Sequence, residues 1–285
     1  MSAKNKKLKI TLSLTTAIVF ILLSVLISEN HIVVKKYNYA TDNSDLCRIV
    51  FISDLHSRSF GEDNSELLDK IVEQNPDLIC LGGDFINDEA TDEEISDFIT
   101  LLSKLKEIAP TYFSYGNHDL NYINAYGDNV SPLIKNTGCA ILEEEYVDIE
   151  INGNPIRLGG MFDYAFNQQY VPDEEWQNGT TYKFLADFTK TDRIKILLCH
   201  RPDSFIYGNA ALWDIDYVLS GHTHGGLWRL PLIGGIIAPE QGIFPQYDKG
   251  EYDIGNIKLI ISSGFDGYDN IPRLFNCPEI TVIEF

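Results

Sequence analysis

The chain has 285 residues, 44% of them hydrophobic, so it is long enough to bury a core without disulfides or a structural metal. Its formal net charge of -20 at pH 7 disfavours nucleic-acid binding through a basic surface, and we expect acidic stretches such as residues 88–94 to be solvated. The five cysteines form no CxxC pair, which disfavours a zinc knuckle or a redox dithiol.

The N-terminal segment predicts a membrane anchor. The run from Ile10 to Ser28 carries no formal charge and is long enough to cross a bilayer as a helix. The first charge after the run is Glu29, whereas the residues before it include Lys4, Lys6, Lys7 and Lys9. The positive-inside rule therefore places the rest of the chain outside the cytoplasm. A cleaved signal peptide is the rival, but the run does not end in an Ala-x-Ala-like site, and we favour an uncleaved single-pass anchor.

Three regions are expected along the chain. Residues 1–28 form the lysine-rich cytoplasmic end and the anchor, residues 29–46 a polar stem, and residues 47–285 one globular domain. Within the domain, apolar runs alternate with helical patterns, as in chains built from βαβ units. The domain is therefore expected to have an α/β fold.

The first half of the domain shows this alternation clearly. Buried strands are expected over residues 48–52 and 78–81, separated by a helix that begins at the N-cap Asn64. The capping-box pattern Thr91-x-x-Glu94 predicts the next helix. Further strands are expected over residues 111–115, 140–142, 194–199, 217–220, 257–262 and 280–285, a hairpin over 146–158 with Asn152-Gly153 at its turn, and a helix over 173–190. Loops that set specificity are expected at residues 57–64, 120–135, 162–180 and 226–248.

Polar motifs follow the ends of the predicted strands, which is where open α/β sheets place their sites. The motifs are Ser53-Asp54-Leu55-His56, Gly82-Gly83-Asp84, Gly116-Asn117-His118-Asp119, Cys199-His200-Arg201-Pro202 and Gly221-His222-Thr223-His224-Gly225-Gly226. Their Asp, Asn and His side chains are ligands suited to Zn, Mn or Fe, and the absence of thiolate ligands argues against a structural zinc site. One motif alone is a weak signal, but five on one chain favour a hydrolytic site with two metal ions.

Together the motifs resemble those of the calcineurin-like metallophosphoesterases, and the resemblance covers most of residues 47–285. Within that superfamily the chain is similar to the membrane-anchored or exported bacterial phosphoesterases. The resemblance implies a two-sheet β-sandwich flanked by helices, preceded here by one transmembrane helix, with two transition-metal ions (Mn, Fe or Zn) at one edge of the sandwich. It implies the following ligands: Asp54, His56 and His224 for one ion, Asn117, His200 and His222 for the other, and Asp84 as a bridge between them.

The same resemblance implies hydrolysis of a phosphoester by a hydroxide that bridges the two ions. His118 is then a catalytic residue that donates a proton to the leaving oxygen or stabilises charge in the transition state, and Asp119 or Asp84 orients it. Two positions depart from related chains, which often have Gln where Leu227 stands and Asp where Asn87 stands. These departures put substrate preference and tuning of the metal site in doubt, rather than hydrolysis itself.

Three functions remain open from the sequence. The leading one is a cell-membrane phosphodiesterase or pyrophosphohydrolase with its catalytic domain outside the cytoplasm, acting on a membrane-surface or envelope substrate that is lipid- or nucleotide-linked. The second is a catalytically inactive metal-binding scaffold for a protein partner. The third is a secreted nucleotidase, released when residues 1–28 are cleaved.

Overall fold

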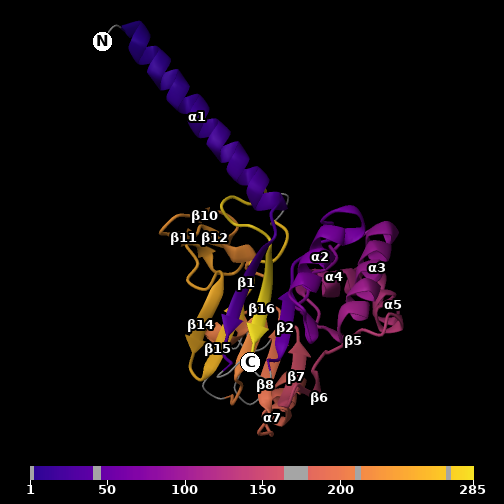
Figure 1. The fold of residues 1–285 in the computed structure, drawn as a ribbon. Helices are drawn as coiled ribbons and strands as arrows, with labels where there is room; N and C mark the ends of the chain where they lie inside the picture. Colours follow the sequence, from indigo (N-terminus) through magenta and orange to yellow (C-terminus); the bar gives the residue numbers. More distant parts are fainter. Residues whose placement is uncertain (1–2, 41–45, 164–178, 209–212, 268–270) are drawn as a thin grey trace.

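The computed structural model describes residues 3–40, 46–163, 179–208, 213–267 and 271–285. Two six-stranded sheets pack face to face, and helices cover the outer face of each (Figure 1). The expected α/β fold, a two-sheet β-sandwich flanked by helices, is confirmed.

The first sheet has the strand order β1-β16-β2-β3-β4-β5. Its strands are β1 (Val33–Asn38), β16 (Glu279–Glu284), β2 (Arg48–Ile52), β3 (Leu78–Leu81), β4 (Thr111–Phe113) and β5 (Ala140–Ile141). β2 to β5 run parallel, β16 is antiparallel to β2, and β1 pairs parallel with β16. The central strands are buried on both faces, which explains why β2 and β3 read as unbroken apolar runs.

The second sheet has the order β14-β15-β9-β8-β7-β6. Its strands are β14 (Gly250–Ile254), β15 (Ile257–Ile261), β9 (Tyr217–Ser220), β8 (Ile194–Cys199), β7 (Asn154–Met161) and β6 (Glu145–Ile151). β15, β9, β8 and β7 are parallel, and each edge strand is antiparallel to its neighbour. The predicted hairpin is confirmed: Asn152 and Gly153 have φ of 51° and 80°, the positive values that a two-residue type I′ turn requires.

Helices and two small hairpins complete the fold. The helices are α1 (Ala3–Asn30), α2 (Ser65–Glu73), α3 (Asp92–Ile108), α4 (Asn117–Tyr126), α5 (Val130–Asn136), α7 (Thr180–Phe188) and α8 (Asp203–Tyr207). The hairpins are β10 (Arg229–Leu230) with β11 (Gly234–Gly235), and β12 (Ile237–Ala238) with β13 (Gly242–Ile243). The helix predicted over residues 173–190 is found as α7, and residues 173–178 of that prediction lie outside the described residues.

Several local predictions need correction. Asn64 precedes α2 but does not cap it, because its side-chain oxygen accepts the backbone N–H of Phe60 at 3.0 Å instead. Most of the loop expected at residues 120–135 is helical, since it lies within α4 and α5. The segment expected to be a polar stem contributes β1 to the edge of the first sheet. The capping box at Thr91 is confirmed.

α1 projects from the domain (Figure 1), and the most apolar 18 residues within its stretch from Lys9 to Asn30 have a mean hydropathy of 2.6. This stretch is long and apolar enough to cross a membrane, although an N-terminal signal sequence would have the same character. The C-terminal end of α1 contacts the domain through two polar interactions. The carboxylate of Glu29 lies 2.8 Å from the guanidinium of Arg58, and the hydroxyl of Ser28 accepts the backbone N–H of Asn276 at 3.3 Å. The helix therefore leaves the domain from a defined point.

Candidate metal centre

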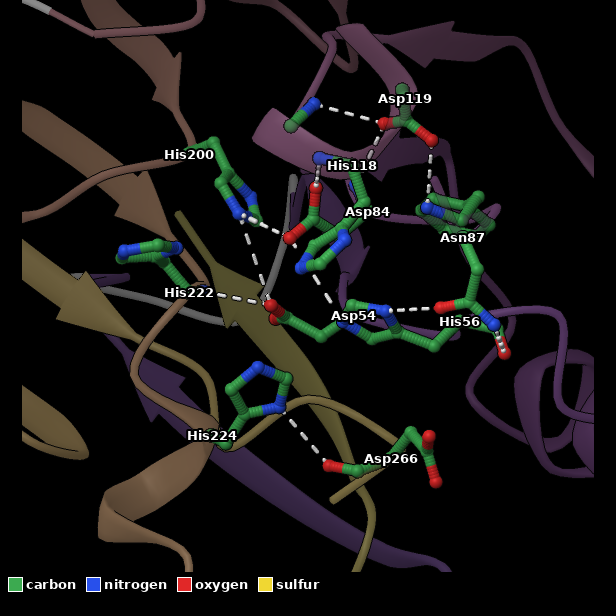
Figure 2. Close-up of polar contacts among 12 residues, drawn as sticks. Asp54, His56, Asp84, Asn87, His118, Asp119, His200, His222, His224 and Asp266 are labelled. Carbon is green, nitrogen blue, oxygen red and sulfur yellow. Dashed lines mark hydrogen bonds and ion pairs between the residues drawn. The ribbon is translucent and has the colours of Figure 1, made fainter. Parts of the chain in front are cut away.

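Five strands from the two sheets end at one site. β2, β3 and β4 of the first sheet end shortly before Asp54, Asp84 and Asn117, and β8 and β9 of the second end shortly before His200 and His222. Figure 2 shows the carboxylates of Asp54 and Asp84 between the rings of His200 and His224. The structure therefore brings together residues that lie far apart in the sequence.

The backbone at the site is strained in a consistent way. Five site residues have a backbone φ between 48° and 68°, in the left-handed region that residues other than glycine rarely adopt. They are Asp54, His56, Asp84, His222 and His224. This conformation costs about 1–2 kcal/mol per residue. Strain gathered on so many polar residues at one point is typical of a functional site, where the direction of each side chain matters more than backbone stability.

Two motif glycines allow the backbone to approach the carboxylates. A Cβ atom on Gly116 would lie 2.1 Å from Oδ1 of Asp84, and one on Gly221 would lie 2.3 Å from Oδ2 of Asp54. Both distances are far below van der Waals contact, so neither position accepts a larger residue without displacing an aspartate. The glycines that open the two histidine motifs are therefore part of the site's geometry.

The potential ligand atoms fall into overlapping groups. Asp54, His56 and His224 form one group, and Asp84, His200 and His222 form another, with the ligand atoms of each group within 4.8 Å of one another. Oδ2 of Asp84 lies 2.9 Å from Nε2 of His200 and 3.8 Å from Nε2 of His56. Asp84 therefore lies between the two groups, where its carboxylate could contact a metal ion in either of them.

Unpaired polar atoms gather at the same place. Among the described residues, Oδ2 of Asp54, Nε2 of His56 and Oδ1 of Asn117 are buried without a hydrogen-bond partner, and Oδ2 of Asp84 and Nε2 of His200 face only each other, at 2.9 Å. A buried polar atom left unpaired costs about 1–3 kcal/mol. Because all five atoms can act as ligands and none is a thiolate, the donor set fits Mn, Fe or Zn ions.

The electrostatics of the buried groups also suit a cation. Burial alone would raise the pKa of Asp84, but His200 and His56 beside it hold that pKa well below its usual range. Burial lowers the pKa of His200, yet the nearby Asp84 carboxylate outweighs burial and raises it to about 9. Burial lowers the pKa of His224 to about 3. At neutral pH the Asp84 carboxylate is therefore ionised, as a metal ligand must be, whereas His200 is protonated and a metal ion that binds to its Nε2 would displace that proton.

Hydrogen bonds orient three of the imidazole rings. Nδ1 of His200 lies 2.7 Å from the carbonyl oxygen of Gly82, and Nδ1 of His224 lies 3.1 Å from that of Asp266. Because a carbonyl oxygen only accepts, each Nδ1 must donate, which leaves the lone pair of each Nε2 for a metal. Asn87 does the same for His56, with its Oδ1 2.9 Å from Nδ1. The residue that departs from related chains thus contacts a predicted ligand directly.

His222 has a partner that the sequence did not indicate. Its Nε2 lies 2.6 Å from Oε2 of Glu240, in the turn between β12 and β13. The other carboxylate oxygen of Glu240 pairs with Arg201. Nδ1 of His222 is then the nitrogen left for the centre. Glu240 was missed because it lies in a segment that has no recognisable motif.

His118 differs from the other site histidines. It is the most exposed of them, with 27% of its side chain accessible, and its Nδ1 lies 2.7 Å from Oδ1 of Asp88. Its ring meets that of His56 edge-on at 4.8 Å. Geometry alone places it in a group with His56 and Asp84 that could hold a metal, but its open position also suits contact with substrate.

Neither expected orienting partner, Asp119 or Asp84, forms the hydrogen bond to the ring of His118; Oδ1 of Asp84 accepts the backbone N–H of His118 at 2.8 Å. The carboxylate of Asp119 is buried and accepts the backbone N–H groups of residues 84–86 and of Gly116, at 2.7 to 3.1 Å. Both of its oxygens are used to hold these two loops together, and Asp88 orients the ring of His118 instead. The sequence places Asp88 in a solvated acidic stretch, because no pattern links it to His118.

An apolar pocket of about 360 Å³ adjoins the centre. It is lined by Thr223, His224, Leu227, Ile237, Ala238, Pro239, Glu240, Gly242 and Ile271. Leu227, the second departure from related chains, is buried in its wall. The site therefore combines a polar, ligand-rich floor with an apolar side wall.

Comparison with known proteins identifies relatives over most of the chain. The model of the calcineurin-like phosphoesterase family matches residues 47–226. The chain is 30% identical to phosphodiesterase YaeI of Escherichia coli, over 85% of this chain and 83% of that protein. It is 34% identical to the uncharacterized metallophosphoesterase YkuE of Bacillus subtilis, over 82% and 77%. A Danio rerio transmembrane protein with a metallophosphoesterase domain is 28% identical, over 83% of this chain and 52% of that protein.

Proposed function

Because the chain belongs to the calcineurin-like phosphoesterase family, we propose that it hydrolyses a phosphodiester or pyrophosphate bond at a centre that binds two transition-metal ions. The observation that carries the proposal is the position of Asp84, whose buried Oδ2 lies between the two groups of ligands, 2.9 Å from Nε2 of His200 and 3.8 Å from Nε2 of His56. One carboxylate between two groups of ligands is the arrangement that a shared ligand needs.

The chain's own residues divide into holders of metal and a residue that contacts substrate. Asp54, His56 and His224 would hold one ion, and Asn117, His200 and His222 the other, with Asp84 shared. When bound, the ions would lower the pKa of the attacking water and stabilise charge on the phosphoryl oxygens. The carbonyl and amide partners of the imidazoles keep the ligands in the correct tautomer.

His118 would then donate a proton to the leaving oxygen. Its Nδ1 is held by Asp88 at 2.7 Å, so the proton to be transferred is the one on Nε2. A ring fixed in one orientation presents that proton at the same place in every turnover. Asp119 would act indirectly, by holding the Asp84 loop against the start of α4.

The N-terminal regions indicate where in the cell the hydrolase acts. Residues 1–28 would anchor the chain in the cell membrane, residues 29–46 would lead into the fold through β1, and residues 47–285 would form the hydrolase outside the cytoplasm. The apolar character of α1 and the lysines at its N-terminal end support this arrangement. Because this location holds the active site near the membrane, we expect a substrate at the membrane surface that is lipid- or nucleotide-linked.

The proposal is tested by metal content and turnover of bis(p-nitrophenyl) phosphate, measured on the full chain. Asp84→Asn preserves shape but removes the shared charge, and we expect it to lose metal and nearly all turnover. Asp69→Asn on the exposed side of α2 is the matched control and should change neither. If the wild-type protein binds metal but hydrolyses no phosphomonoester, phosphodiester or pyrophosphate, the proposal is wrong. That result would favour a catalytically inactive metal-binding scaffold.

A further inference from the structure

The two small hairpins carry an unusual concentration of exposed apolar side chains. We call this surface the apolar lip; it consists of Leu230, Leu232, Ile233, Ile237, Ile243 and Phe244. Leu232 is fully exposed, and Ile243 and Phe244 are 71% and 61% exposed. Water-facing loops of a soluble domain rarely gather so many large apolar residues, so the lip is expected to face something other than water.

The charge pattern of this segment points the same way. In a chain with a net charge of -20, residues 230–247 contain a single charged residue, Glu240. That carboxylate is directed away from the lip, toward His222 and Arg201 at the metal centre. The lip itself therefore presents no formal charge.

The lip lies beside the membrane-spanning helix. Figure 1 shows β10, β11 and β12 at the end of the domain from which α1 projects. Phe275 packs against Phe20 of α1, with ring centroids 5.9 Å apart, and also lines a hollow with Leu232 and Ile233 of the β10–β11 hairpin. Phe20 lies eight residues before Ser28, which corresponds to about 12 Å along the helix. If α1 crosses a bilayer, the loop carrying Phe275 already lies beside its apolar part.

The lip also borders the entrance to the catalytic site. Ile237 belongs to the lip and to the wall of the apolar pocket beside His224. Trp228, 42% exposed, lies at the base of the first hairpin and donates its indole N–H to the carbonyl oxygen of Pro272. A tryptophan with one apolar and one polar side is typical of the membrane–water boundary.

We propose that the apolar lip inserts into the bilayer leaflet at the C-terminal end of α1, so that the pocket beside the metal centre opens onto the lipid. The class of substrate that follows is a lipid-linked phosphoester, whose apolar chain enters between the hairpins while its phosphate reaches the metal ligands. This inference deepens the proposed hydrolase function and rests on it for the substrate class, whereas insertion of the lip rests on its exposed apolar side chains, its lack of charge and its position beside α1.

Insertion is tested by quenching of tryptophan fluorescence in nanodiscs of phosphatidylcholine and phosphatidylglycerol that contain dibrominated phosphatidylcholine. The full-length Leu232→Trp variant should gain a signal that brominated lipid quenches by at least half, after subtraction of the wild-type signal. Glu150→Trp, on the exposed side of β6 in the far part of the domain, is the matched control and should be quenched by less than a tenth. Equal quenching at the two positions, or failure of the chain to enter the nanodisc, would overturn the proposal.

The substrate class is tested with Leu232→Ser combined with Ile233→Ser, since both residues are exposed and neither is a proposed metal ligand. Turnover of a p-nitrophenyl-linked phospholipid in vesicles should fall at least tenfold, while turnover of soluble bis(p-nitrophenyl) phosphate stays unchanged. Equal loss on both substrates would refute the lipid-facing role. If the wild type hydrolyses neither substrate, the hydrolase proposal fails but the quenching result still decides insertion. A detergent-solubilised dimer that the two serines dissociate would assign the lip to a second copy of the chain and contradict the proposal.

Discussion

Replacing His118 by Gln should slow hydrolysis while leaving both metal ions bound. The ring is 27% exposed, and its partner Asp88 is 48% exposed, so breaking their contact should cost about 1 kcal/mol of stability or less. Loss of a positioned general acid lowers the rate about 10² to 10⁴-fold, equivalent to about 3 to 5 kcal/mol in the transition state. The rate should therefore fall far more than the stability.

The assay compares kcat for two diesters that differ in leaving group. A p-nitrophenolate leaves without much protonation, whereas an alkoxide needs a proton, so His118→Gln should harm the alkyl diester at least tenfold more than the aryl diester. Metal content is measured on the same samples, and His31→Gln, at an exposed histidine, is the control. Loss of one metal equivalent in His118→Gln would show that His118 is a ligand, and equal losses on the two diesters would show that it is not the acid.

Three further predictions concern the support of the site. Asn87→Ala should weaken metal binding about 10 to 100-fold by freeing the ring of His56, measured by competition with a chelator, and Asn87→Asp should restore it. Gly221→Ala should reduce metal content and melting temperature, because the added Cβ would meet Asp54 at 2.3 Å; an unchanged variant would disprove this packing argument. Burial raises the pKa of Asp203 to about 7, so the stability that depends on its protonated form is complete below the ordinary pKa of 3.8 and is lost as pH rises toward 7. Asp203→Asn should therefore raise the melting temperature by a few degrees at pH 8 but not at pH 4, and the opposite trend would contradict the burial argument.

The sequence predicted the strands and the motif residues well, for a physical reason. Each motif follows a buried strand directly, so local patterns locate both the strand and the residues at its carboxyl end. Because parallel strands bring these ends to one edge of a sheet, Asp54, Asp84 and Asn117 are expected together from the sequence alone. The resemblance to a family added the expectation that the strands form two packed sheets, which local patterns do not show.

What the sequence did not predict depends on contacts between distant segments. Asp88 reaches His118 across a gap of 30 residues, and Glu240 reaches His222 from a hairpin turn. Neither lies in a motif, and acidic residues are common on surfaces, so their sequence context favours a solvated role. The prediction for Asp119 failed for the opposite reason. Its place in a motif suggested that it orients His118, but its carboxylate accepts four backbone N–H groups instead.

The most direct test of the two-metal centre is anomalous diffraction from crystals of the full chain loaded with Mn. We predict two anomalous peaks roughly 3.5–4 Å apart, one beside Asp54 and His224 and the other beside Asn117 and His222, with the Asp84 carboxylate between them. A single peak, or a peak ligated by His118 in place of Asn117, would contradict the proposed division between metal ligands and proton donor.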